Sequence, residues 1–222
     1  MATEQRTLSS VSTSVLSTNK VLKNTYILLS VTLLFSAATA WLAKSMGMPF
    51  IHPLITLGIF FGLIFGLSRL QNSVWSLPLV FILTGFLGAT LGPILNVYMS
   101  SASGESVVMM ALGGTGAIFL GLSGYVLTTR KDFSFMGGFL VVGALVAMLA
   151  MLANLFFQVP AVSLTISAVV ILLMSGFILF DTSRIIHGGE TNYVMATVSL
   201  YLSIYNIFVS LLQLLGFFSR EE

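Results

Sequence analysis

The sequence predicts an all-α membrane protein, a single bundle of seven transmembrane helices. Three observations lead to this fold class: 57% of the 222 residues are hydrophobic, only 7% are charged, and the mean hydropathy is +1.04. A soluble domain carries about 25% charged residues and cannot bury so much apolar surface at this size. Composition therefore excludes a soluble enzyme, a nucleic-acid-binding protein and a disordered scaffold.

Long stretches without Asp, Glu, Lys or Arg locate the helices. They cover residues 24–43, 45–68, 70–104, 106–129, 133–180 and 191–219. A helix needs about 20 apolar residues to cross a bilayer, so each stretch holds one span and 133–180 holds two. Asn154, Gln158 and Pro160 predict a tight hairpin inside that stretch. The predicted spans are 24–43, 51–68, 76–98, 106–128, 134–156, 160–181 and 194–217. The apolar runs do not alternate with polar residues, which excludes a β-barrel.

Residues 1–23 precede the first span and are rich in Ser and Thr. Their low hydrophobicity predicts a disordered tail, and residues 24–222 then form the seven-helix bundle. The tail either has no role or serves as a flexible handle for a cytoplasmic partner.

The basic residues predict the orientation. One side of the predicted topology holds seven of the nine: Arg6, Lys20, Lys23, Arg69, Arg130, Lys131 and Arg184. The other side holds Lys44 and Arg220. Because cytoplasmic loops carry the excess of Lys and Arg, we expect a cytoplasmic N-terminus and a C-terminus on the outer side of the membrane.

Small residues in three spans predict where helices pack closely, because helices in lipid associate by close backbone approach. The third span carries Gly85, Gly88 and Gly92; the fourth Gly113, Ala117, Gly121 and Gly124; the fifth Gly137, Gly138, Gly143 and Ala147.

A polar stripe marks the last helix. Its members recur at the heptad-like period of one helix face: Ser199, Ser203, Asn206, Ser210 and Gln213. Five polar side chains are costly against lipid, so we expect the seventh helix to be central and enclosed by the other six. Either the stripe bonds to adjacent helices as packing contacts, or it lines a hydrated pathway.

Asp181 closes a long apolar run, and the predicted topology places it at or just inside the cytoplasmic boundary of the membrane. Such a residue is a candidate functional site. One interpretation is an interfacial carboxylate that simply meets water. The other is a proton-sensitive latch whose cationic partner is Arg184 or Arg69.

Nothing in the sequence indicates catalysis or a metal site. There are no cysteines. His187 and Glu190 flank two glycines without a third ligand, and the Gly-Gly-Thr-Gly run at 113–116 lies within a span and lacks the Lys of a phosphate-binding loop. We expect no enzyme activity, no cofactor and no nucleic-acid partner.

Three segments resemble the BAX inhibitor-1 (TMBIM) family: residues 178–181 (Ile-Leu-Phe-Asp), 199–202 (Ser-Leu-Tyr-Leu) and 206–208 (Asn-Ile-Phe). Segments at 16–26, 84–88, 92–96, 125–132 and 187–193 are similar to its bacterial branch, typified by a modulator of the membrane protease FtsH. This resemblance implies seven helices with the last one central.

The resemblance also implies two functions. The bacterial branch implies an inner-membrane protein that binds FtsH and restrains its proteolysis of membrane proteins, with the tail as the segment the protease grips. Channel-like members imply a pH-sensitive calcium leak gated by two aspartates. Asp181 matches the first aspartate, but Ser203 stands at the second position. A carboxylate and a hydroxyl cannot share a proton as two carboxylates do, and calcium prefers several charged oxygens.

Overall fold

The computed structural model describes the backbone of residues 2–219 and the side chains of residues 18–219. The elements are α1 (Ala2–Ser45), α2 (Pro53–Leu70), α3 (Ser76–Met99), α4 (Gly104–Thr129), the short 3-10 helix η1 (Ser134–Met136), α5 (Gly137–Phe157), α6 (Pro160–Ile186) and α7 (Tyr193–Phe218). Seven of the described helices are long and apolar enough to cross a membrane, the first of them over Thr18–Ser45. The all-helical fold and its seven spans are confirmed.

Helix α1 begins at Ala2, so helical backbone extends through most of the segment expected as a disordered tail. The side chains of residues 1–17 lie outside the described part of the structure. The division into a tail over 1–23 and a bundle over 24–222 stays a prediction.

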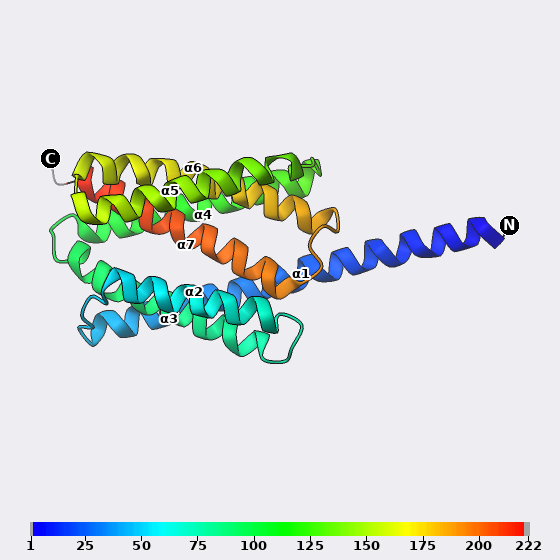
Figure 1. Cartoon of the computed structure of the whole chain (residues 1–222), viewed down its shortest axis with the longest axis horizontal. Coiled ribbons are helices and arrows are strands. Elements are labelled where there is room, and N and C mark those ends of the chain that lie inside the picture. Colours follow the sequence, from blue (N-terminus) through cyan, green and yellow to red (C-terminus); the bar gives the residue numbers. More distant parts are fainter. Residues whose placement is uncertain (1, 220–222) are drawn as a thin grey trace.

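The bundle consists of two groups of three helices with α7 between them (Figure 1). In one group α1 and α2 pack against α3; in the other α4 and α5 pack against α6. Helix α7 packs against members of both groups, α1, α3, α4 and α6. Enclosure of α7 by all six neighbours is not confirmed. Helix α3 is as deeply buried as α7, with 50% of its most apolar window inside the bundle.

The glycines of α3 fit tightly against α1. A side chain at Gly88 would collide with Ser36 and Thr39, and one at Gly92 with Ala43. The prediction for this helix is therefore confirmed. It is wrong for α4, because a side chain at Gly113, Gly121 or Gly124 would meet no described atom within 4 Å. These glycines face outward, since α4 packs through its other face.

The hairpin between α5 and α6 forms where the sequence predicted it. Gln158 adopts a left-handed backbone conformation with φ of 51°. The side-chain oxygen Oδ1 of Asn154 accepts a hydrogen bond from the Val159 N–H (3.0 Å), and its side-chain amide donates to the Ser163 hydroxyl (2.6 Å). Asn154 thus binds both sides of the turn, and Pro160 starts α6.

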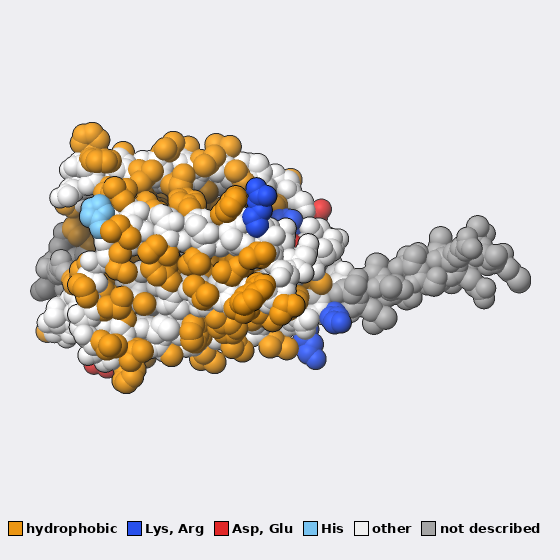
Figure 2. Space-filling model, turned by 60° about the horizontal axis from the view of Figure 1, so that its bottom comes forward, with side chains coloured by type: hydrophobic (Ala, Val, Ile, Leu, Met, Phe, Trp, Pro, Cys, Tyr) orange, Lys and Arg blue, Asp and Glu red, His pale blue; other side chains and the backbone are white. Residues whose placement is uncertain are grey.

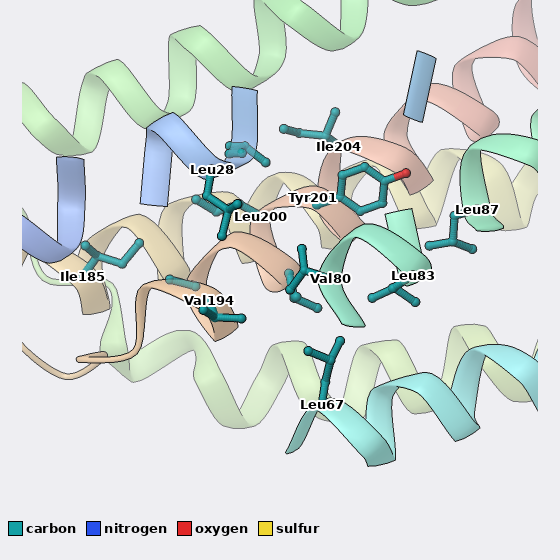
Figure 3. Close-up of a cluster of buried hydrophobic side chains, with 13 residues drawn as sticks. Leu28, Leu67, Val80, Leu83, Leu87, Ile185, Val194, Leu200, Tyr201 and Ile204 are labelled. Atoms are coloured by element: carbon teal, nitrogen blue, oxygen red, sulfur yellow. The ribbon is translucent and has the colours of Figure 1, made fainter. Parts of the chain in front are cut away.

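One cluster of buried apolar side chains joins five helices (Figure 3). It includes Leu28 of α1, Leu67 of α2, Leu83 of α3, Ile185 of α6 and Leu200 of α7. Because these side chains come from both groups, the cluster fixes α7 where the groups meet.

On the face that Figure 2 shows, Lys and Arg side chains lie toward one end of the bundle, and hydrophobic side chains are spread along its length. One end, here called the basic end, holds Lys20, Lys23, Arg69, Arg130, Lys131 and Arg184, which lie where α2, α4 and α6 finish. Lys44 lies at the opposite end. Arg6 and Arg220 lie outside the residues whose side chains are described.

Candidate functional site

Asp181 is nearly buried, with 7% of its surface exposed. Helix α6 continues beyond it to Ile186, so the residue lies more than one turn inside the helix rather than at its end, where the predicted span stopped. Its Oδ2 accepts a hydrogen bond of 2.5 Å from the Ser199 hydroxyl. This pair connects α6 to α7 at the basic end.

The two expected cationic partners of Asp181 have other contacts. Arg184 forms an ion pair with Glu190 (3.5 Å) and donates a hydrogen bond to the Gly189 carbonyl (3.0 Å). Arg69 lies over the Phe65 ring, 5.0 Å from its centre. Within residues 18–219, no ion pair includes Asp181. The structure therefore supplies Asp181 with a hydroxyl partner, and Arg184 instead fixes the loop between α6 and α7.

The polar stripe of α7 separates into three parts. Ser199 binds Asp181. Ser203 is buried, and its hydroxyl donates to the Ser199 carbonyl (3.2 Å), so it does not complete a pair with Asp181. Toward the other end, the Ser167 hydroxyl donates to Gln213 Oε1 (2.7 Å). Both ends of the stripe thus bond to α6, as the packing interpretation expects.

A cavity of about 600 Å³ lies beside the second half of the stripe, between α5, α6 and α7. Its polar lining is uncharged and comes from Asn154, Gln158, Ser163, Ser167, Asn206, Ser210 and Gln213. Two helical turns, about 10 Å, separate Asn206 from Ser199. The cavity accommodates polar ligands or water at the end of the bundle opposite to Asp181.

Helix α7 has a second polar face, which the sequence pattern did not predict. This face consists of residues four apart, Thr197, Tyr201 and Tyr205. Their hydroxyls form hydrogen bonds with α1 and α3. Tyr201 shares a hydrogen bond with the Ser36 hydroxyl (2.6 Å) and donates to the Thr84 carbonyl (3.2 Å).

The other two residues of this face make similar contacts. The Tyr205 and Thr90 hydroxyls share a bond of 2.9 Å, and Thr197 donates to the Thr25 carbonyl (3.2 Å). The four-residue spacing of these hydroxyls could have predicted the face. It was overlooked because tyrosine is classed as hydrophobic although its ring carries a hydroxyl.

The loop between α4 and η1 is attached to α6 near the same end. The Ser183 hydroxyl accepts from the Phe133 N–H (2.9 Å), and His187 Nδ1 lies 2.8 Å from the Ser183 carbonyl oxygen. Hydrogen bonds from the side chain and backbone of Ser134 hold the pKa of the exposed Asp132 below its ordinary value. Asp132 is therefore ionised at neutral pH and caps this loop.

No group of three or more His, Asp or Glu side chains suited to a metal occurs in the described part of the chain. The expectation that the protein holds no metal or cofactor stays a prediction. A cation at Asp181 would meet a single carboxylate and hydroxyl groups, a weak ligand set for calcium.

Comparison with known proteins finds relatives along nearly the whole chain. The model of a family described as inhibitor of apoptosis-promoting Bax1 matches residues 18–220. A protein of Escherichia coli (strain K12) named modulator of FtsH protease YccA is 56% identical over 209 residues, which is 94% of this chain and 95% of the relative. A second Escherichia coli strain has an inner membrane protein YccA with the same identity and coverage. An uncharacterised protein of Pseudomonas aeruginosa is 50% identical over 202 residues, 91% of each chain.

Proposed function

Because the chain belongs to the Bax inhibitor family, we propose that it is an inner-membrane protein that binds an FtsH-type protease and restrains its proteolysis of membrane proteins. One observation carries this proposal: 56% identity, over 94% of the chain, to a protein named as a modulator of FtsH protease. The match extends over nearly the whole of both chains, which supports a shared role.

The proposed orientation has the N-terminus in the cytoplasm and the C-terminus in the periplasm. The six cations of the basic end support it, because cytoplasmic segments carry the excess of Lys and Arg. With this orientation, Asp181 and the loop fixed by Arg184 face the cytoplasmic side. Residues 1–23 then extend from that side, where an ATP-driven protease can take hold of them.

The proposed restraint combines a chain end that the protease grips with a bundle that resists extraction. We propose that α7 is the helix that holds the bundle together. Its Thr197, Tyr201 and Tyr205 bond to α1 and α3, and its Ser199 and Gln213 bond to α6. Since each such bond contributes about 1 kcal/mol, together they make removal of a single helix slow. A protease that engages this bundle is then occupied and unavailable to other substrates.

A reconstituted degradation assay tests the proposal. Proteoliposomes would hold the FtsH-type protease, a membrane-protein substrate and increasing amounts of this protein. We expect the initial rate of substrate loss to fall as this protein increases, and the two proteins to co-purify after detergent extraction.

An unrelated seven-helix protein at the same mole fraction controls for crowding of the bilayer. Absence of co-purification would contradict binding. Co-purification with an unchanged rate of substrate loss would contradict restraint.

A second candidate function is a pH-sensitive calcium or cation leak gated near Asp181. It is favoured by the buried Asp181 carboxylate of α6, which bonds to α7, and by a polar cavity that α6 and α7 both line. Ser203 lies on α7 between Ser199 and the residues that line the cavity. Its hydroxyl donates to the Ser199 carbonyl, and it supplies no second carboxylate. The proton that would open such a gate then acts on Asp181 and its bond to Ser199, without the shared proton of an aspartate pair.

Calcium flux into proteoliposomes between pH 6 and 8 tests this candidate, with Asp181→Asn beside the unaltered protein. Flux no greater than in empty liposomes would exclude the leak. Equal flux in both proteins would remove Asp181 from its mechanism.

A further inference from the structure

An apolar groove opens on the outside of the bundle between α1 and α4. Its volume is about 460 Å³. Leu33, Ala37 and Trp41 are among the residues of the α1 wall, and Leu112, Gly116 and Phe119 among those of the α4 wall. The floor includes Tyr201, Ile204, Tyr205 and Phe208, so the groove reaches α7 directly from the lipid phase.

The dimensions of the groove select the kind of occupant. It extends from residue 33 to residue 44 on α1 and from 119 to 108 on α4. Eleven helical steps give about 16 Å, roughly half of the bilayer core, so the groove spans one leaflet. A membrane-spanning helix is about 30 Å long, nearly twice the length of the groove, whereas one acyl chain spans a single leaflet, so the length of the groove matches a hydrocarbon chain.

The outer end of the groove carries a positive charge. Lys44 lines it there and touches the Met99 sulfur with its Nζ at 3.0 Å. Within the described residues, Lys44 has no carboxylate partner. The Asn96 amide donates to the Lys44 carbonyl (3.2 Å) and fixes the position of this last turn of α1.

Along the rest of the groove, a bound molecule does not have to supply hydrogen bonds. The Ser36 and Tyr201 hydroxyls at its floor bond to each other. Trp41 is 68% exposed one turn before Lys44, a position typical of aromatic anchors at the membrane interface.

We propose that the groove between α1 and α4 binds one acyl chain of an anionic phospholipid, whose phosphate group pairs with Lys44. The chain lies against Tyr201, Tyr205 and Phe208, so the bound lipid contacts the helix that joins the two groups. In the proposed orientation, this lipid belongs to the periplasmic leaflet.

Trp41 provides a direct probe, because the sequence has only two tryptophans and Trp75 lies at the start of α3, at the basic end. The full chain with Trp75→Phe would be reconstituted in phosphatidylcholine containing increasing amounts of brominated phosphatidylglycerol or brominated phosphatidylcholine. Bromine quenches a nearby tryptophan. We expect half-maximal quenching of Trp41 at a roughly fivefold lower mole fraction of the anionic lipid, the preference that one lysine supplies.

Two pairs of variants locate the site. Lys44→Gln should abolish the preference for the anionic lipid, and Lys23→Gln, at the other end, should retain it. Gly116→Leu should fill the groove and weaken quenching by the anionic lipid, because a side chain there meets open space. Gly121→Leu is the matched control, since Gly121 also faces open space but does not line the groove.

Equal quenching by both lipids would overturn headgroup selection. A preference that survives Lys44→Gln would overturn the role of Lys44. Identical curves for Gly116→Leu and Gly121→Leu would overturn the groove as the site.

Discussion

Ser199 on α7 donates a hydrogen bond of 2.5 Å to the carboxylate of Asp181, which α6 buries more than one turn before it ends. A single hydroxyl is thus the described hydrogen-bond donor to an acidic side chain inside a membrane protein. Hydrogen bonds to charged groups are stronger than neutral ones, and a buried acceptor that loses its donor is costly. The pair is therefore a point at which α6 and α7 depend on each other.

Ser199→Ala should destabilise the protein because it leaves the Asp181 carboxylate buried without its donor. The expected loss is about 1–3 kcal/mol, measured as the free energy of unfolding in mixed micelles. Ser203→Ala is the matched control, since that hydroxyl donates to the backbone of its own helix. Equal losses for the two variants would contradict a special role for the pair. Asp181→Asn combined with Ser199→Ala should cost less than the sum of the single changes, because the two residues interact.

Tyr201→Phe should loosen α7 from the first helix group. The hydroxyl of Tyr201 bonds both to Ser36 and to the Thr84 carbonyl, and the residue is 1% exposed. Removal of this one oxygen should cost roughly 1–3 kcal/mol in the free energy of unfolding. Tyr125→Phe changes the same atom at an exposed site and should cost less than about 0.5 kcal/mol. A loss at Tyr201 no larger than at Tyr125 would show that the second polar face is not a structural connection.

Much of the fold was predictable because charge-free stretches and helix lengths follow from the same bilayer thickness. The predicted span 76–98 corresponds to Ser76–Met99, and 194–217 to Tyr193–Phe218. The first helix differs, because it begins at Ala2 and not at residue 24. A polar segment can extend a helix whose apolar part lies further along the chain. The sequence could not show this, because hydrophobicity reports membrane burial and not backbone conformation.

The candidate site was only partly predictable. Spacing along α7 identified Ser199 and Gln213 as members of one face, but spacing cannot say which neighbour a face meets. Arg184 was an expected partner of Asp181 by proximity in sequence, yet it turns to Glu190, an ion pair that needs less desolvation. The face of Tyr201 and Tyr205 was missed because an aromatic ring hides a hydroxyl in any count of apolar residues.

Gly88→Ala should disrupt the packing of α1 on α3. A Cβ at this position would collide with the backbone oxygen of Ser36, which cannot move without its helix. We expect a loss of more than about 2 kcal/mol, seen as a lower thermal midpoint and faster proteolysis. Gly58→Ala in α2 provides the control, because a Cβ there meets open space and should change the free energy of unfolding by less than about 0.5 kcal/mol. Equal midpoints for the two variants would contradict close α1–α3 packing.

Deletion of residues 2–18 should lengthen the lifetime of this protein in cells with an active FtsH-type protease. The reason is that a processive protease needs a chain end to grip, and the proposed cytoplasmic end would be removed. Pulse-chase labelling measures the lifetime, and deletion of residues 220–222 at the other end serves as the control. If the first deletion leaves the lifetime unchanged, residues 2–18 are not the handle. The same measurement in cells without the protease should show no difference between the variants.

The orientation can be measured with little background because the chain has no cysteine. Val74→Cys probes the loop between α2 and α3, where Val74 is 88% exposed, and Ala102→Cys probes the exposed loop between α3 and α4. A maleimide that cannot cross the inner membrane should label Ala102→Cys in intact spheroplasts and Val74→Cys only after lysis. The expectation follows from Arg69 and the other cations of the basic end, because Lys and Arg are in excess in cytoplasmic segments. The reverse pattern would invert the proposed topology and move residues 1–23 out of reach of a cytoplasmic protease.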